Sequence, residues 1–412
     1  MTTPNPDQHD LPNLASANLG AKIIFATDEW FSEAPNLLKD NTAVFDESTF
    51  TEYGKEMDGW ECRRRRKEGN DWAVIRLGIT GIVDTIEVDT LWFTGNYSPK
   101  CRIQAIYYDP ESEPKECDML IDERARAVQA RATEKLRNDG RMGLAASDRE
   151  VQLANALNSD AWEDVVSLQE LGAGYPETCQ KFFKLATPKL ISHLRLNMGP
   201  DGGIARLRVY GVVSKSQSSQ NMGVQDLAYV ENGGIALGCS DMHYGHPRNL
   251  TNPGRGLVMG DGWETARQAK RPAVYERGAD GLMVLPGNDW AVLQLGMPGT
   301  ITSVDVDTNH YKGNYPESCL IEGCYIKDTG NTSDDRNRLK GLLCRDDNDS
   351  SLEWFTLLPR APLTASEQHT FDLSSDVSAR PVSHLKLTIY PDGGVQRLRV
   401  FGTPLLDPKS RL

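Results

Sequence analysis

The sequence predicts a mostly β protein made of two tandem β-sandwich or jelly-roll domains, the first of which carries a helical insertion. Three observations support this fold class: a direct internal repeat, apolar residues that recur with period two, and one helix-forming segment that occurs only once. The chain has 412 residues, which is enough for two or three domains that each bury a core.

The repeat is visible in two blocks of sequence. Residues 69–97 align without a gap to residues 287–315 and match at 15 of 29 positions. Residues 200–211 match residues 391–402 at 9 of 12 positions. The offset of roughly 200 residues is that of whole domains, because solenoid repeats recur every 20 to 50 residues.

Alternation with period two predicts strands inside each repeat. Ile86, Val88 and Trp92 alternate with Glu87 and Asp89, which is typical of a strand with one buried face and one polar face. Glycine and proline punctuate these short runs, as in sandwiches and jelly rolls.

A Pro-Asp-Gly-Gly turn follows one of these strands in each repeat, and we expect it to close a β-hairpin. Arg195 would then lie opposite Arg208, and Lys386 opposite Arg399, on the face away from the core. Like charges that face each other across two strands are destabilising. We therefore expect an acidic surface of a partner chain to cover them.

The remaining segments set the predicted domain organisation. Residues 122–158 are rich in Ala, Arg, Glu and Leu and have no counterpart of equal length in the second repeat, so they predict a helical insertion. A polar, Ser- and Gln-rich stretch between the repeats is typical of a linker. The expected order is a flexible N-terminal tail, the first sandwich, the linker, the second sandwich and a C-terminal tail, at residues 1–20, 21–213, 214–226, 227–404 and 405–412.

Composition excludes several kinds of partner. The chain has 45 Lys and Arg against 58 Asp and Glu, a formal net charge of −13. Such a surface repels phosphate groups, so we expect neither nucleic acid nor a membrane as partner. No stretch has the pattern of a secretory signal or the length of a membrane span. The eight cysteines form no CxxC pair, which favours a reducing compartment.

The last three residues suggest a location. Ser410-Arg411-Leu412 differs by one residue from the Ser-Lys-Leu address of peroxisomal import. We therefore expect the protein in the peroxisome. A match of three residues also arises by chance, and the cytoplasm is the alternative.

Two positions differ between otherwise matching contexts of the two repeats. Repeat one has Trp30 and Trp92 where repeat two has His243 and His310. Imidazole titrates near neutral pH and also binds metals. Two histidines beside carboxylates therefore predict a proton-transfer site in repeat two. The alternative is that histidine only replaces tryptophan at a partly exposed rim.

Each repeat also places a glutamate beside arginine. Glu61 precedes residues 63–66, which are all arginine, and Glu264 precedes Arg267. Arginine grips a carboxylate bidentately, and a neighbouring glutamate can act as a base or can simply pair with the arginine. The motif predicts either a site for an anionic substrate or an ordinary surface ion pair.

Signals for a cofactor are weak. No P-loop, dinucleotide fingerprint, serine nucleophile elbow or zinc-protease motif occurs. Asp241, His243 and His246 have a spacing that a divalent metal could use, although loops rich in Asp and His also occur without metal. We expect no required cofactor, with a divalent metal at these three residues as the alternative.

Several longer motifs resemble the allantoicases, and the resemblance covers nearly the whole chain, including the duplication. The motifs are DEWF at 28–31, GHPRNL at 245–250, PGRG at 253–256, DGWET at 261–265 and DTNHYKGNYP at 307–316. The resemblance implies tandem β-sandwiches similar to galactose-binding jelly rolls and assembly into homo-oligomers such as hexamers. It also implies hydrolysis of allantoate to (S)-ureidoglycolate and urea in purine breakdown.

The chemistry implied by the resemblance suits residues of repeat two. Allantoate carries a carboxylate and two ureido groups on one carbon, and one ureido group is replaced by hydroxyl. This requires proton transfer and firm positioning of the carboxylate and amides. The expected catalytic residues are His243, His310 and Glu264, and the expected substrate-binding residues are Arg267 for the carboxylate, Asn314 for a ureido group, Lys312, Arg64, Glu61 and Asn96.

A tandem carbohydrate-binding module is the alternative function. Jelly rolls of this kind often bind sugars, and a fold does not determine a function. Such a module would need exposed aromatic platforms and an extracellular setting. The lack of a secretory signal, the unpatterned cysteines and the C-terminal tripeptide all favour the enzyme.

Overall fold

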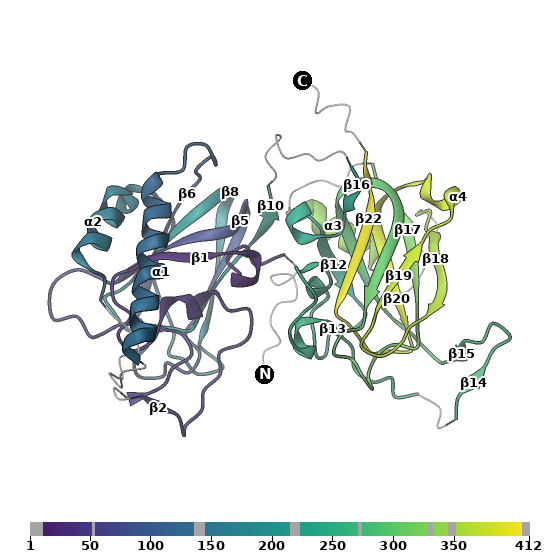
Figure 1. Cartoon of the computed structure of the whole chain (residues 1–412), viewed down its shortest axis with the longest axis horizontal. Helices are drawn as coiled ribbons and strands as arrows, with labels where there is room; N and C mark the ends of the chain where they lie inside the picture. The colour runs from purple at the N-terminus through teal and green to yellow at the C-terminus, as the bar shows by residue number, and fades with distance from the viewer. Residues whose placement is uncertain are drawn as a thin grey trace. The chain divides into compact units, whose positions relative to one another are not determined.

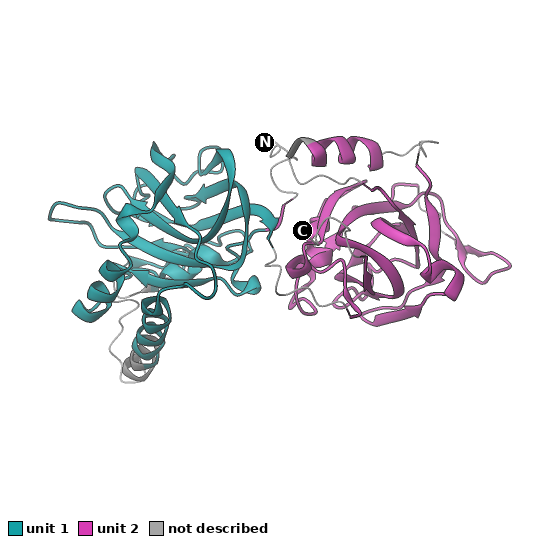
Figure 2. Cartoon of the chain, turned by 90° about the horizontal axis from the view of Figure 1, so that it is seen from above, with its two compact units in different colours: residues 1–8, 13–214 teal, residues 9–12, 215–412 magenta. Residues whose placement is uncertain are grey.

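The computed structural model describes residues 11–51, 54–135, 145–214, 223–270, 274–327, 333–344 and 352–405. The chain folds into two compact units (Figure 2). Unit 1 comprises residues 1–8 and 13–214, and unit 2 comprises residues 9–12 and 215–412. The predicted mostly β fold with a tandem duplication is confirmed.

The main sheet of unit 1 has six strands in the order β1, β5, β8, β6, β7, with β10 also paired to β5 (Figure 1). Their bounds are β1 Lys22–Ala26, β5 Trp72–Asp89, β6 Lys100–Ile106, β7 Glu163–Glu170, β8 Gln180–Met198 and β10 Arg206–Val213. Two short ladders pair β2 Phe50–Thr51 with β3 Gly54–Lys55, and β4 Trp60–Glu61 with β9 Gly203–Ile204. Alternate residues such as Ile86, Val88 and Leu207 form the core, as their period predicts.

The helical insertion of unit 1 comprises α1 Lys115–Lys135 and α2 Asp148–Ala156. Ser147 caps α2 in a capping box with Glu150, because each side chain bonds the other residue's backbone N–H. Cys117 and Leu120 of α1 pack with Val74 of β5 against one face of the sheet. The insertion therefore begins before the predicted residue 122 and covers a face of the sheet that would otherwise meet solvent. Residues 136–144 lie outside the described residues.

The expected flexible tail through residue 20 differs from the structure. Asn13 forms a β-bridge with Tyr210, and Leu14 and Ala15 are buried in the core of unit 1. The 3-10 helix η2, Ala17–Leu19, follows. Residues 13–20 are thus part of the folded unit because their apolar side chains fill its core, while residues 1–10 lie outside the described residues.

Unit 2 repeats this architecture. Its main sheet has the order β11, β22, β16, β20, β17, β18, with β12 and β19 also paired to β16 (Figure 1). The bounds are β11 Gln225–Asp226, β12 Ile235–Cys239, β16 Asp289–Asp307, β17 Ser318–Cys324, β18 Phe355–Pro362, β19 Gln368–Asp372, β20 Pro381–Tyr390 and β22 Arg397–Pro404. Two short ladders pair β13 Trp263–Glu264 with β21 Gly394–Val395, and β14 Glu276–Arg277 with β15 Met283–Val284.

Among the described residues, unit 2 has no helix as long as α1. Its α-helices are α3 Ser333–Leu343 and α4 Ser375–Ser378, so the long insertion is specific to unit 1 in the part of the chain that the structure describes. The remaining 3-10 helices are η3 Ala34–Leu38, η4 Ser159–Ala161, η6 Val230–Asn232, η7 Pro247–Thr251 and η8 Met259–Asp261. Within the described ranges, no helix combines the length and the apolar character that a bilayer crossing requires.

The Pro-Asp-Gly-Gly turns do not close the predicted hairpins. β8 and β10 do not pair with each other; both pair with β5. Arg208 consequently lies opposite Glu87, and Arg399 lies opposite Asp305 in unit 2. The predicted juxtaposition of like charges is therefore wrong, because the turn leads the chain across the central strand and each arginine meets a carboxylate within its own unit.

Candidate active site

Each repeat brings a glutamate and an asparagine into contact at the same place. In unit 1, the Asn96 side chain donates a hydrogen bond to Glu61 Oε1 over 2.7 Å. In unit 2, Asn314 donates to Glu264 Oε1 over 2.5 Å. The glutamates end the short strands β4 and β13, directly after fully buried tryptophans that fix these strands. The duplication therefore preserves a carboxylate–amide pair in both units.

An open cleft of about 590 Å³ lies beside the pair in unit 1. Glu61 and Asn96 line it, together with Phe31, Phe45, Lys55, Trp92 and Tyr175. Burial raises the pKa of Glu61, although the hydrogen bond from Asn96 and the positive charge of Arg64 both act to lower it. The cleft thus offers a carboxyl group that protonates more readily than an exposed glutamate, next to aromatic surface.

Trp92 and His310 occupy equivalent places with an unusual backbone. Their φ angles are 73° and 69°, in the left-handed region that side chains other than Gly, Asn and Asp rarely adopt. In each case a ring nitrogen contacts a loop carbonyl. Trp92 Nε1 donates to the Ala43 oxygen over 2.8 Å, and His310 Nε2 lies 3.1 Å from the Gly256 oxygen. The ring-to-loop bond therefore accompanies the strained backbone in both repeats.

The contact with Gly256 determines the tautomer of a neutral His310. A carbonyl oxygen only accepts hydrogen bonds, so Nε2 must carry the hydrogen that it donates. The lone pair of the neutral ring then lies on Nδ1. The indole of Trp92 has a single nitrogen, and that nitrogen is a donor only. The two rings make the same structural bond, but only His310 keeps a nitrogen that can take up a proton.

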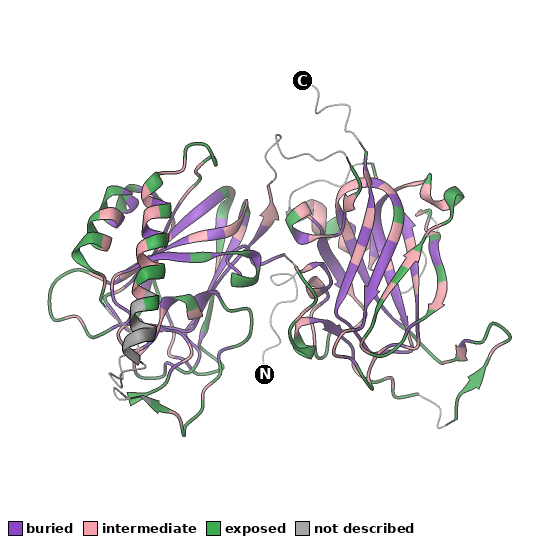
Figure 3. Cartoon of the chain, in the orientation of Figure 1, coloured by how far each residue is buried: buried purple, intermediate pink, exposed green. Residues whose placement is uncertain are grey.

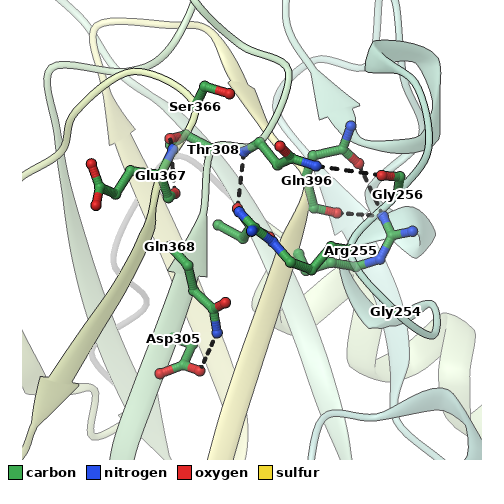
Figure 4. Close-up of polar contacts among 12 residues, drawn as sticks. Gly254, Arg255, Gly256, Asp305, Thr308, Ser366, Glu367, Gln368 and Gln396 are labelled. Atoms are coloured by element: carbon green, nitrogen blue, oxygen red, sulfur yellow. Dashed lines mark hydrogen bonds and ion pairs between the residues drawn. The ribbon is translucent and has the colours of Figure 1, made fainter.

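An ion pair anchors the loop that supplies the Gly256 carbonyl. Arg255 forms a bidentate ion pair with Asp307 at the end of β16, with distances of 2.8 and 3.0 Å. The Asp307 side chain is 4% exposed, so this pair is shielded on the carboxylate side. Figure 4 shows the loop beside Gln396 and near the segment where Thr308 contacts Glu367. His310 follows Asp307 by three residues, so one anchor fixes both the ring and its partner loop.

His243 is exposed and lies beside Glu264 in the backbone pairing. The neighbouring Gly245 forms a β-bridge with Glu264, and the His243 ring packs edge-on against Tyr244 with centroids 4.4 Å apart. Trp30, its counterpart in unit 1, instead lies under the Arg63 guanidinium at 4.7 Å. Among the described residues, neither His243 nor His310 forms a hydrogen bond with Glu264.

The cations expected at the site differ between the repeats. The Arg64 guanidinium contacts the Gly95 oxygen at 3.4 Å and lies 3.6 Å from Asp201. Arg267, at the equivalent position, and Lys312 are exposed and have no hydrogen-bond or ion-pair partner within the described residues. In repeat two, Arg267 and Lys312 therefore carry positive charges without a paired carboxylate. Each of them lies within three residues of Glu264 or Asn314 in the sequence.

The metal alternative at Asp241, His243 and His246 is not supported. Asp241 Oδ2 accepts two backbone N–H groups, from His243 over 3.3 Å and from Ala266 over 2.6 Å. His246 Nδ1 accepts the N–H of Arg248 at the start of η7. Within the described ranges these three residues do not form a cluster of possible metal ligands. Asp241 Oδ2 and His246 Nδ1 bond backbone N–H groups of the loop instead.

Sequence reasoning missed two parts of the site. The Gly256 carbonyl and its Arg255–Asp307 anchor have a sequence signal only in the PGRG motif, which has no visible counterpart in repeat one. Phe45 and Tyr175, which line the cleft of unit 1, lie outside the repeated blocks. Their place in the cleft depends on loops whose conformation the repeat does not predict.

Comparison with known proteins gives a consistent picture. The family model for the allantoicase repeat matches residues 12–214 and 225–405. A probable allantoicase of Pseudomonas fluorescens strain Pf0-1 is 38% identical over 391 residues, which is 95% of either chain. A probable allantoicase of Pseudomonas paraeruginosa is 38% identical over 402 residues, covering 97% of this chain and 98% of that one.

A solved structure agrees with the sequence comparisons. The crystal structure of allantoicase from Saccharomyces cerevisiae is 29% identical, with a TM-score of 0.64, and the match covers 95% of this chain and 92% of that chain. The similarity extends over both units, so the tandem arrangement as well as the single sandwich is shared.

Proposed function

The chain belongs to the allantoicase family, and from that premise we propose that repeat two performs the proton transfers of the reaction. The protein is a hydrolase that converts allantoate to (S)-ureidoglycolate and urea in purine degradation. The alternative of a non-catalytic carbohydrate-binding module is not favoured by these similarities.

The reaction sets clear requirements for the site. One C–N bond of allantoate breaks, and one C–O bond to water forms. The departing ureido nitrogen gains a proton, and the attacking water loses one. The carboxylate and the second ureido group must be held while this happens. The site therefore needs a cation, amide-binding groups and at least one group that exchanges protons near neutral pH.

His310 is the proposed proton-transfer group, and one observation carries this assignment. The ring donates through Nε2 to the Gly256 oxygen, so Nδ1 of the neutral ring can accept the proton of water. The imidazolium so formed can then give that proton to the leaving urea. Trp92 makes the same bond to a loop carbonyl but has no second nitrogen, which restricts this role to repeat two.

Glu264 and its neighbours complete the proposed site. The Glu264 carboxylate is buried and receives the Asn314 amide, so it can orient Asn314 toward a ureido group or exchange a proton itself. Arg267 is the proposed partner of the substrate carboxylate, because its guanidinium is exposed and unpaired within the described residues. His243 and Lys312 are also exposed and are proposed to contribute a second acid–base group and a further cation.

Repeat one is proposed to bind substrate without taking part in proton transfer. Glu61, Asn96 and Arg64 correspond to Glu264, Asn314 and Arg267, and two of them line the open cleft of unit 1. The set lacks an imidazole at the positions of Trp30 and Trp92. We therefore assign these three residues to substrate binding without proton transfer.

The test compares urea release from allantoate by matched variants. His310→Ala, His243→Ala and Glu264→Gln should each lower turnover by about 10²- to 10⁴-fold, the usual effect of losing an acid–base group. Trp92→Ala and Trp30→Ala are the repeat-one controls and should retain most of the activity. Circular dichroism establishes that each variant is folded. Near-normal turnover in both histidine variants would refute the assignment to repeat two.

Assembly and cofactor use are further parts of the proposal. We propose that the protein forms a homo-oligomer, specifically a hexamer. Sedimentation of the purified protein tests this directly. We also propose that the proton transfers need no metal, because side chains of repeat two supply the acid–base groups. Turnover that falls on chelation while the circular dichroism spectrum stays unchanged, and that returns with a divalent ion, would contradict this second point.

Location is proposed from the C-terminal tripeptide, which lies outside the described residues. If Ser410-Arg411-Leu412 is read as a peroxisomal address, deleting it should move a tagged enzyme from organelles to the cytosol without changing turnover. The same cytosolic distribution with and without the tripeptide would contradict the proposal.

A further inference from the structure

A buried cluster of Glu113, Cys117 and His193 lies between the helical insertion and the sheet of unit 1. Glu113 lies two residues before α1, Cys117 is in its first turn and His193 belongs to β8. One potential ligand atom from each residue lies within 4.8 Å of the other two. Cys117 is 0% exposed and His193 is 1% exposed, and Figure 3 shows the strands under α1 as largely buried. The cluster is in unit 1, outside the proposed proton-transfer site.

The hydrogen bonds of Ser192 indicate which nitrogen of His193 carries hydrogen. Ser192 Oγ accepts the backbone N–H of Tyr108 over 2.8 Å and can donate its own hydrogen to the Ile106 oxygen at 3.4 Å. Its remaining lone pair faces His193 Nδ1 at 2.9 Å. This arrangement is satisfied when Nδ1 carries hydrogen and donates it to Ser192.

A neutral ring with hydrogen on Nδ1 leaves a bare lone pair on Nε2. This nitrogen lies 3.1 Å from Glu113 Oε1, which as a carboxylate oxygen also only accepts. Both atoms are buried and have no hydrogen-bond partner among the described residues. Two lone pairs that face each other in a buried site repel unless a positive species lies between them.

We propose that Glu113, Cys117 and His193 bind a divalent transition metal, with Zn²⁺ as the best fit. Nitrogen, sulfur and carboxylate oxygen are the ligands that zinc takes in proteins. Ser192 would be the outer partner that fixes the ligating histidine, as is usual at such sites. A proton shared between Glu113 and His193 would need no third ligand. The Cys117 sulfur beside these two atoms therefore favours a metal ion over a shared proton.

The surroundings suit a divalent cation in charge and in polarity. Arg76 binds the other oxygen of Glu113 at 2.9 Å and also Asp118 at 3.2 Å. With Cys117 as thiolate, three anionic groups and one guanidinium leave two uncompensated negative charges. The rings of Tyr108 and Trp162 lie 5.3 and 6.3 Å from the His193 ring. An apolar shell of this kind limits water access and strengthens the metal–ligand bonds.

The second repeat provides an internal comparison. Ser383 and His384 repeat the Ser192–His193 contact with the same distance of 2.9 Å. Gln294 stands at the position of Arg76, and no second cluster of three potential ligands occurs in the described part of unit 2. The Ser–His pair therefore belongs to the ancestral sandwich, and the other two ligands, Glu113 and Cys117, came with the segment that contains the insertion. The metal would tie this insertion to the sheet.

The experiment titrates the chelator-treated full chain with Zn²⁺ by calorimetry and with Co²⁺ by absorption. The wild type should bind about one equivalent, and its Co²⁺ form should show a thiolate-to-metal charge-transfer band. Cys117→Ser should abolish that band. Cys117→Ser and His193→Gln should each weaken binding by more than about 100-fold, since even outer partners of a metal site contribute 10- to 100-fold. Zn²⁺ should also raise the melting temperature of the wild type.

Matched variants separate a site-specific effect from a folding defect. His384→Gln removes the equivalent histidine of repeat two and should leave binding unchanged. Ser192→Ala keeps all three ligands and should weaken binding by about 10- to 100-fold. Cys117→Ser replaces one atom, so it tests the site even if His193→Gln does not fold. Absence of binding by the wild type would overturn the proposal and leave a proton between Glu113 and His193. Binding that survives in Cys117→Ser would overturn it equally.

Discussion

Replacing His310 by Trp tests the proton-transfer assignment by installing in repeat two the residue of repeat one. Trp92 adopts a φ of 73°, close to the 69° of His310, and its ring N–H reaches a loop carbonyl over 2.8 Å against 3.1 Å for His310. The substitution His310→Trp can therefore keep both the backbone conformation and the ring-to-loop bond. It removes the second ring nitrogen and makes the side chain larger at a partly exposed position.

The expected effect on turnover is large and the effect on stability small. Loss of a general acid–base group lowers the rate by about 10²- to 10⁴-fold, which corresponds to about 3 to 5 kcal/mol in the activation free energy. The free energy of unfolding should change by less than about 1 kcal/mol, because the position is not in the core and keeps its hydrogen bond. A drop in kcat without a loss of stability is thus the signature of the proposed role.

The assay measures urea release from allantoate at saturating substrate, with urea denaturation as the stability control. His310→Gln separates chemistry from steric block, because glutamine is small and keeps an N–H donor but cannot exchange a proton near pH 7. Trp92→His is the reciprocal variant and should have wild-type turnover. If His310→Gln has near-normal turnover while His310→Trp has little, bulk is responsible and the reasoning from the two ring nitrogens is refuted.

Three further predictions concern binding, ion pairs and pH. Arg267→Ala should raise KM for allantoate about tenfold or more, with a smaller change in kcat, because a charged hydrogen bond contributes about 1.5 to 3 kcal/mol. Arg64→Ala, the matched repeat-one variant, should also raise KM and leave kcat nearly unchanged, and an unchanged KM in Arg267→Ala would contradict its proposed role. Arg208→Ala should lower the free energy of unfolding by about 3 to 5 kcal/mol, because Glu87, 2.8 Å away, stays buried without its charged partner. The control Lys39→Ala breaks the more exposed pair with Asp58 and should lower the free energy of unfolding by about 1 kcal/mol or less. Similar small losses in both variants would show that burial of the ion pair does not determine its contribution. Burial lowers the pKa of His384 to about 4, so its contribution to stability is present above the unfolded pKa of about 6.5 and is lost as pH falls toward 4. Over this interval the free energy of unfolding of the wild type should fall by up to about 3 kcal/mol more than that of His384→Gln. The same pH dependence of stability in both proteins would count against the prediction.

The repeat, the sandwich class and the residues of the paired glutamate motif follow from sequence alone. A match of 15 in 29 positions between residues 69–97 and 287–315 requires two copies of one fold, since a duplicated sequence buries the same pattern twice. Alternation with period two separates the two faces of each strand. It correctly assigns Ile86 and Val88 to the core, but Trp92 lies beyond the end of β5 and is exposed.

The same alternation does not tell what covers the polar face. Glu87 and Asp89 were assigned to the polar face of a half-buried strand, yet each is 1% exposed, and Arg208 pairs with Glu87 within unit 1. His193 and Asn197 on β8 are likewise buried, and His193 lies beside Cys117 of the helical insertion. An alternation with period two indicates that the two faces of a strand differ in polarity. Only the pairing of β5 with β8 and β10 decides which side chains meet across neighbouring strands.

The candidate site divides in the same way between sequence and structure. The duplication itself singled out His310, because a comparison with Trp92 needs no coordinates. The bond from its ring to the Gly256 oxygen joins residues 54 positions apart, and the Glu113–His193 contact joins residues even farther apart in the chain. Such contacts depend on how loops and an insertion pack on a sheet, and packing is a property of the whole folded chain rather than of any local pattern.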